Sequence, residues 1–342
     1  MRYATAILVA VLLTTSCVKD KPVTQTNTSV QLSLGKKVFM VNEGNFGSGN
    51  ASISLFDPAT SVVIDDIYKN VNSNSPGDVA QSLSKINGSF YLVMNNSGKI
   101  IVCDEQMKKR SEITGLNSPR YALAVSNSKA YVSDLYSRSI HIIDLSTGSK
   151  TGSIAMPGWT EKMEIVYGKV FVTCPNSNYV FVLDAQTNKL TDSVWVGQGA
   201  GSMVLDKNDR LWVLASGDLN KKTTARLSRI NAVTLQSEKF FDFAPQQSPA
   251  SLCENKTKDT LYYANGSIFK MPIDAVQLPS MAWINFSQKT IYGLACSPTD
   301  YNLYASDALD YVQRSTIYVY SPYGTEIRTF KAGINTNSFY FD

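Results

Sequence analysis

The side chains that most enzymes use for acid–base, nucleophilic or metal chemistry are scarce in this sequence. Its single histidine, His141, falls inside a predicted strand, where we interpret it as a packed or rim residue. Without a second histidine, a multi-histidine metal site and a Ser-His or Cys-His nucleophile centre elsewhere are excluded. The cysteines show no CxxC or metal-ligand spacing. Carboxylates remain available, but the pattern predicts a protein that is not an enzyme and has neither a metal nor another cofactor.

Two further classes of ligand are disfavoured. The glycine-rich residues 44–49 are followed by neither a Lys-Ser/Thr pair nor a predicted helix, so they do not form a phosphate loop. The formal net charge of +4 is small and dispersed along the chain, unlike the basic patch of a nucleic-acid-binding protein.

Binding chemistry is better represented, by amide and aromatic side chains in predicted loops. We predict a ligand site from three kinds of side chain. The aromatic candidates are Phe46, Tyr136, Trp159 and Tyr292, the amide candidates are Asn45, Asn96, Asn176, Gln198, Gln247 and Asn335, and the charged candidates are Glu43, Arg120 and Glu161. Such groups suit a bulky, largely uncharged ligand with amides or hydroxyls and apolar faces. The alternative is that the amides form turns and the rings pack locally.

The elements that must position these residues repeat seven times. Each repeat contains a short alternating strand that ends in a turn, at residues 52–57, 99–104, 139–144, 179–184, 226–231, 267–272 and 316–321. A period of about 40 to 50 residues with several short strands per unit indicates a radial array of blades. The sequence therefore predicts an all-β, seven-bladed β-propeller with four strands in each repeat.

The two ends of the repeat region predict how the ring closes. Residues 38–42 match a second strand, so the first blade lacks an inner strand at the N-terminal side. Residues 337–342 align with the inner strand at 201–206. We therefore expect the C-terminal strand to complete the first blade, which removes an open sheet edge. With this strand order, the candidate loops share one face of the propeller.

The residues before the repeats read as a targeting segment. Residues 1–16 resemble a lipoprotein signal peptide, with Arg2, a short apolar run and a lipobox at residues 13–17. Cys17 would then be lipidated and hold the chain at a membrane surface. Residues 17–34 are predicted to be a flexible tether and residues 35–342 the propeller. Lys19 and Asp20 resemble a surface-export signal, which predicts an outer-membrane lipoprotein exposed at the cell surface.

Two cysteines leave an alternative open. Cys253 and Cys296 fall at matching positions of neighbouring repeats, and a disulfide would require a Cα separation of about 5.5 Å. Since neighbouring inner strands usually diverge too far, reduced thiols are the other outcome.

The segments Ala130-Tyr-Val-Ser-Asp134 and Val170-Phe-Val-Thr-Cys174, each followed by an alternating strand, resemble the YVTN-type (YncE-like) β-propellers. With residues 38–53 and the lipobox, the chain is similar to surface propeller lipoproteins of Bacteroidetes. One branch, the BtuG type, captures vitamin B12 and passes it to a TonB-dependent outer-membrane transporter. The resemblance implies that this chain binds a corrinoid and meets such a transporter. The alternative is a propeller that interacts with proteins or glycans and has no small-molecule ligand.

Overall fold

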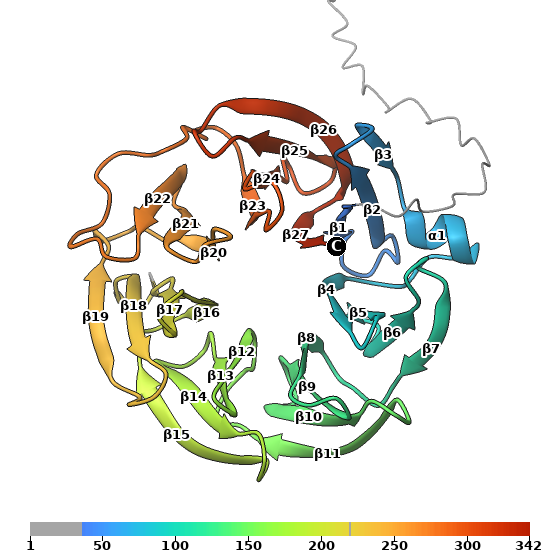
Figure 1. Cartoon of the computed structure of the whole chain (residues 1–342), viewed down its shortest axis with the longest axis horizontal. Coiled ribbons are helices and arrows are strands. Elements are labelled where there is room, and N and C mark those ends of the chain that lie inside the picture. The colour runs from blue at the N-terminus through green and yellow to red at the C-terminus, as the bar shows by residue number, and fades with distance from the viewer. Residues whose placement is uncertain (1–35, 219) are drawn as a thin grey trace, which may run out of the picture. The chain divides into compact units, whose positions relative to one another are not determined.

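The computed structural model describes residues 36–218 and 220–342, and the seven repeated segments within them each provide the third strand of an antiparallel sheet. The seven sheets stand radially around a central channel, with the inner strands near the axis and the fourth strands on the perimeter (Figure 1). The predicted all-β, seven-bladed propeller is confirmed.

Each sheet is one blade, and its strands are given from the channel outward. Blade 1 consists of β27 (Thr336–Phe341), β1 (Val38–Asn42), β2 (Ser52–Asp57) and β3 (Val62–Ile64). Blade 2 consists of β4 (Ala80–Ile86), β5 (Ser89–Met94), β6 (Lys99–Cys103) and β7 (Lys109–Ile113). Blade 3 consists of β8 (Pro119–Ala124), β9 (Lys129–Asp134), β10 (Ser139–Asp144) and β11 (Ser149–Ala155).

The remaining blades follow in chain order. Blade 4 consists of β12 (Met163–Val166), β13 (Lys169–Thr173), β14 (Tyr179–Asp184) and β15 (Lys189–Trp195). Blade 5 consists of β16 (Ala200–Leu205), β17 (Arg210–Ala215), β18 (Arg226–Asn231) and β19 (Ser237–Asp242). Blade 6 consists of β20 (Ala250–Glu254), β21 (Thr260–Ala264) and β22 (Ile268–Pro272). Blade 7 consists of β23 (Ile291–Cys296), β24 (Leu303–Asp307), β25 (Arg314–Tyr320) and β26 (Glu326–Ile334).

Two elements differ from the four-strand pattern predicted for every repeat. Blade 6 has three strands in the described part of the chain, and only the bridge between Ile268 and Ile284 continues outside β22. Pro279, in the segment between β22 and Ile284 where a fourth strand would run, lacks the backbone N–H that a strand ladder needs. A short helix, α1 (Ile67–Asn72), occupies part of the connection between blades 1 and 2.

The hydrophobic core lies between blades, because both faces of each central strand are covered by neighbours. In β14, Val180 and Val182 pack in the cluster shared with blade 5. The alternate residues of the same strand, Phe181 and Leu183, pack in the cluster shared with blade 3. The period of two in the repeated segment therefore assigns alternate side chains to two different neighbours.

The predicted ring closure is also confirmed. β27 pairs antiparallel with β1, for example Met40 with Phe339, and the C-terminus lies beside blade 1 (Figure 1). Thr336 Oγ1 donates to the buried Asn42 Oδ1 at 2.6 Å. The closing strand is therefore held by side-chain as well as ladder hydrogen bonds.

The predicted signal peptide, the predicted lipidation site Cys17 and the whole predicted tether, residues 17–34, lie outside the described residues. Within residues 36–218 and 220–342, no helix is long and apolar enough to cross a membrane.

Candidate ligand-binding cavity

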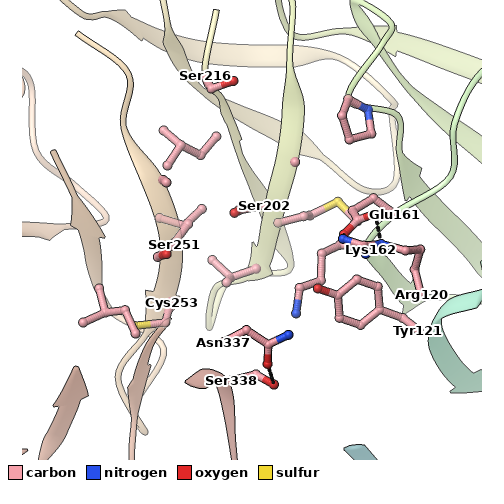
Figure 2. A pocket seen from close by; sticks show the side chains of 18 of the residues that line it. Arg120, Tyr121, Glu161, Lys162, Ser202, Ser216, Ser251, Cys253, Asn337 and Ser338 are labelled. Atoms are coloured by element: carbon pink, nitrogen blue, oxygen red, sulfur yellow. Dashed lines mark hydrogen bonds and ion pairs between the residues drawn. The ribbon is translucent and has the colours of Figure 1, made fainter. Parts of the chain in front are cut away.

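A cavity of about 700 Å³ runs from the predicted loop face into the central channel. Loop residues Leu135, Trp159 and Pro175 line its mouth, and inner-strand residues such as Met203 and Leu294 line it further in. Figure 2 shows side chains from several blades, including Arg120, Ser202 and Asn337, that point into this common space. The size is within the range of pockets that hold small organic ligands.

The lining is built by a backbone irregularity that recurs around the ring. In blade 2, Ala80 pairs with Met94 and Ser82 pairs with Val93, so Gln81 is an extra residue without a partner in the ladder. The register shifts in the same way near the second residue of six inner strands, at Gln81, Arg120, Gly201, Ser251, Tyr292 and Asn337. A β-bulge redirects a side chain from the sheet, and all six residues line the cavity.

Blade 4 achieves the same result just before its inner strand. The N–H of Glu161 donates to the carbonyl of Thr173 at 3.0 Å, and the N–H of Thr173 donates to the carbonyl of Lys162 at 2.9 Å. Two residues thus oppose one, and both Glu161 and Lys162 line the cavity.

Six residues on one wall are linked by hydrogen bonds through their side chains and the Gln81 backbone carbonyl, and we call them the polar belt: Tyr292, Glu43, Asn337, Gln81, Arg120 and Glu161. Tyr292 Oη donates to Glu43 Oε2 at 2.5 Å, and Asn337 Nδ2 donates to Glu43 Oε1 at 2.8 Å. The same amide donates to the Gln81 carbonyl at 2.9 Å. The belt therefore spans blades 7, 1, 2, 3 and 4.

The Arg120–Glu161 ion pair closes one end of the polar belt. Arg120 Nε and Nη2 donate to the two carboxylate oxygens of Glu161, both at 2.7 Å, and Nη1 donates to Gln81 Oε1. Burial opposes the charged guanidinium, but the Glu161 carboxylate raises the pKa of Arg120 above its ordinary value. Burial, followed by Glu43, raises the pKa of Tyr292. Arg120 therefore stays cationic, and Tyr292 stays a neutral donor.

Three further charged residues line the cavity, Lys162, Glu164 and Glu254. The Lys162 ammonium lies 4.1 Å from the centroid of the Tyr121 ring, a cation–π arrangement. Burial, followed by the nearby Glu254 carboxylate, raises the pKa of Glu164 to about 7, and burial also raises the pKa of Glu254. At neutral pH, Glu164 is thus only partly ionised.

Aromatic side chains stand at the mouth. The rings of Tyr136 and Trp159 meet edge to face with centroids 6.1 Å apart, and both are exposed. Asn176 Oδ1 accepts a 2.8 Å hydrogen bond from the Trp159 backbone N–H, which positions this loop. On the other side, Tyr292 and Tyr311 meet edge to face at 5.7 Å. The mouth thus offers apolar faces beside the polar belt.

The structure brings five of the predicted site residues together in the cavity wall: Glu43, Arg120, Trp159, Glu161 and Tyr292. The others do not line it: Asn45, Phe46, Asn96, Tyr136, Asn176, Gln198, Gln247 and Asn335. Tyr136 and Asn176 still act on Trp159, whereas Phe46 is 77% exposed on the loop face. Arg120 and Glu161, the predicted charged candidates for ligand contact, are paired with each other.

Several predicted amides serve the backbone instead. Asn45 Nδ2 donates to the Tyr311 carbonyl, Asn335 Nδ2 to the Gly44 carbonyl and Gln198 Nε2 to the Pro175 carbonyl. Asn96 binds the Asp78 carboxylate, and Gln247 accepts from the Ala244 N–H. In the structure these five amides therefore bind other groups of the protein, four of them backbone groups and Asn96 the Asp78 carboxylate.

Eight lining residues on or directly beside inner strands were not predicted from the sequence: Gln81, Tyr121, Lys162, Glu164, Ser202, Ser251, Glu254 and Asn337. Position within the inner strand could have identified several of them, because in six inner strands the second residue lines the cavity.

The remaining candidate chemistry is structural. Cys253 and Cys296 are free thiols in one apolar cluster, so the disulfide is not formed in this structure. Burial raises the pKa of both thiols. His141 is buried with Nε2 3.1 Å from Asp134 Oδ2, in agreement with a packed residue. In the described residues, no group of three or more His, Cys, Asp or Glu side chains is arranged to hold a metal ion.

Solved structures show the same fold at low sequence identity. A quinonprotein alcohol dehydrogenase-like protein of Bacteroides thetaiotaomicron is 17% identical with a TM-score of 0.68, and the match covers 89% of this chain and 77% of that one. The periplasmic gluconolactonase PpgL of Pseudomonas aeruginosa is 13% identical with a TM-score of 0.68, covering 90% and 99%. A protein of Lactobacillus plantarum is 11% identical with a TM-score of 0.67, covering 90% and 99%.

Sequence comparison is more restricted. A search of curated proteins found none similar to this chain. The model of one family, described as a domain of unknown function (DUF5074), matches residues 36–341 and so spans the whole propeller. The chain belongs to the DUF5074 family.

Proposed function

We propose that this protein is a non-enzymatic, cell-surface lipoprotein that captures a corrinoid at the loop face and hands it to a TonB-dependent outer-membrane transporter. The observation that carries the proposal is the 700 Å³ cavity at the loop face, with Trp159 at its mouth and the polar belt in its wall. Aromatic faces next to hydrogen-bonding groups suit a ligand with both a broad macrocycle and peripheral amides.

The cavity is smaller than a whole corrinoid. Such a ligand would lie across the mouth, with its macrocycle against Trp159 and Tyr136 and one edge inserted toward the polar belt. The two exposed rings would lose contact with water on binding, which contributes favourable free energy.

Calorimetry with cyanocobalamin and cobinamide tests this function. We expect both ligands to bind, with affinities that depend little on salt because the ligands are mostly uncharged. Trp159→Ala should weaken binding by about 2 kcal/mol, or roughly thirtyfold in Kd, as aromatic anchors often do. Trp195→Ala is the matched control, because Trp195 is exposed on a perimeter strand and does not line the cavity. Absence of binding by both corrinoids to the folded protein would refute the proposal.

The surface location has its own test. Cys17→Ala removes the proposed lipidation site, so the variant should leave the membrane fraction because acyl chains supply the anchoring free energy. Membrane retention equal to that of the unmodified protein would contradict a lipoprotein.

A perimeter patch favours a second candidate, a protein- or glycan-interaction propeller. The Arg226 guanidinium lies 4.6 Å from the Trp195 ring centroid and 4.1 Å from that of Phe240, and both rings are about half exposed. Arg226 also binds both oxygens of Asp242, at 2.6 and 2.8 Å. Trp, Tyr and Arg are typical of interaction hot spots. Retention on immobilised polysaccharides that is lost in the Trp195→Ala/Phe240→Ala double variant, without corrinoid binding, would support this candidate.

A further inference from the structure

The charges in the cavity wall restrict the kind of ligand further than the volume of the cavity does. The lining contains four carboxylates, Glu43, Glu161, Glu164 and Glu254, against two cations, Arg120 and Lys162. With all six groups ionised, as at alkaline pH, the formal net charge of the lining is −2, and partial protonation of Glu164 makes it less negative near neutral pH. An anion entering this space would meet a net negative environment of low dielectric, where like charges repel strongly.

Neither cation of the wall provides a positive charge that nearby carboxylates do not already offset. Three nitrogens of Arg120 already donate to Glu161 and Gln81, and the bidentate geometry makes the Glu161 pair strong. Lys162 is held over Tyr121 and stabilises the ionised forms of Glu164 and Glu254. A ligand carboxylate could pair with Arg120 only by leaving the buried Glu161 without its partner, which is costly. Beside Lys162 it would also meet the carboxylates of Glu164 and Glu254.

The wall opposite the polar belt provides room and neutral hydrogen-bonding groups. Gly201 and Ser251 occupy the bulge positions of blades 5 and 6, where the other blades carry large polar side chains. Ser202 and Ser216 add hydroxyls on the same wall, as Figure 2 shows. A primary amide can exchange hydrogen bonds with hydroxyls and with the belt without separating an ion pair.

We infer that the cavity takes an uncharged, hydrogen-bonding edge of the ligand, such as a primary amide, and rejects a carboxylate in the same position. The inference rests on the proposed function, because it specifies which part of a captured corrinoid enters the cavity. It also makes Glu43 a specificity-determining residue: its carboxylate contributes to the repulsion while its two oxygens hold Tyr292 and Asn337 in place.

The experiment compares cyanocobalamin with its monocarboxylic acid derivatives, in each of which one peripheral propionamide is hydrolysed to a carboxylate. Calorimetry at pH 8 should show at least one isomer, the one whose altered side chain enters the cavity, binding about tenfold or more weakly than the parent. The isomers whose altered groups stay in solvent should bind like the parent.

Two variants connect this discrimination to the wall. Glu43→Gln removes one negative charge and retains a hydrogen-bonding side chain, so the discrimination between amide and carboxylate should fall several-fold. The matched control is Glu105→Gln, because Glu105 is exposed in a turn on the opposite face and does not line the cavity. Its discrimination should equal that of the unmodified protein.

The outcomes separate the two proposals. Equal affinities for the parent and every carboxylate isomer would overturn the inference and leave corrinoid capture standing. If Glu43→Gln discriminated between amide and carboxylate as strongly as the unmodified protein, the proposed role of Glu43 and the cavity wall in that discrimination would also be overturned. If cyanocobalamin itself does not bind, the proposed function fails, and the inference about its inserted edge fails with it.

Discussion

At the scale of single residues, Glu164 makes the stability of the fold depend on pH. In the unfolded chain its carboxyl has an ordinary pKa of 4.5, whereas burial and Glu254 raise the pKa to about 7 in the fold. Between these values the folded protein binds more protons than the unfolded chain, so this group makes the fold less stable as pH rises.

Glu164→Gln should remove that dependence. Relative to the unmodified protein, the variant should be more stable at pH 8 by on the order of 1–3 kcal/mol and should gain little at pH 4.5. Urea unfolding at both pH values measures the difference, with Glu105→Gln as an exposed control. An equal effect of Glu164→Gln at both pH values would contradict the raised pKa.

The Arg120–Glu161 pair gives a second prediction at this scale. Arg120→Ala should destabilise the fold by about 3 kcal/mol, because Glu161 is buried and would keep a charge without its partner. Arg120→Ala/Glu161→Gln should recover much of that loss in the same urea measurement, since no buried charge then remains unpaired. A double variant no more stable than the single one would show that the loss arises from packing.

At the scale of elements, the central strands behave differently from isolated amphipathic strands. An isolated amphipathic strand buries one face, whereas in β14 the residues from Val180 to Leu183 are all apolar and all buried. The reason is radial packing, in which each sheet is covered by a neighbour on both sides.

Substitutions along β14 test this arrangement. Phe181→Ala should cost about 3–5 kcal/mol because it removes a buried ring from the cluster shared with blade 3. Tyr179→Ala, at the exposed start of the same strand, is the control and should cost less than about 1 kcal/mol. Similar shifts of the urea midpoint for both variants would contradict packing on two sides.

At the scale of the whole molecule, stability depends on the closure of the ring. β27 supplies the inner strand of blade 1 and contacts blade 7 through Ser306 Oγ, which donates to the Thr336 carbonyl at 2.5 Å. Without β27, both the edge of β1 and the apolar surface of blade 7 would be exposed.

Deletion of residues 337–342 should therefore lower the melting temperature by many degrees and expose apolar surface to a hydrophobic dye. Removal of residues 17–34, the predicted tether, is the control and should leave the melting temperature of the propeller unchanged. A melting temperature unaffected by the C-terminal deletion would mean that β27 is not needed for a stable ring.

Much of the fold follows from local pattern alone. Residue type and spacing alone reveal the repeated segment, its period and the match of residues 337–342 to an inner strand. The structure confirms the predicted number of blades and the predicted closure of the ring. The absence of a fourth strand in blade 6 was not predicted, because the neighbouring repeats indicate four strands, whereas Pro279 disfavours a strand locally.

The candidate site was less accessible, because it depends on distances between blades. Sequence placed Glu43, Arg120, Glu161 and Tyr292 on one face, but only the folded ring decides that they bond to one another and form a belt. The bulges that turn Gln81 and Asn337 into the channel depend on pairing with another strand. Pairing between distant segments is a property of the tertiary structure. The sequence alone determined which functional groups this protein has, and the closed ring decided which of them lie together in the cavity.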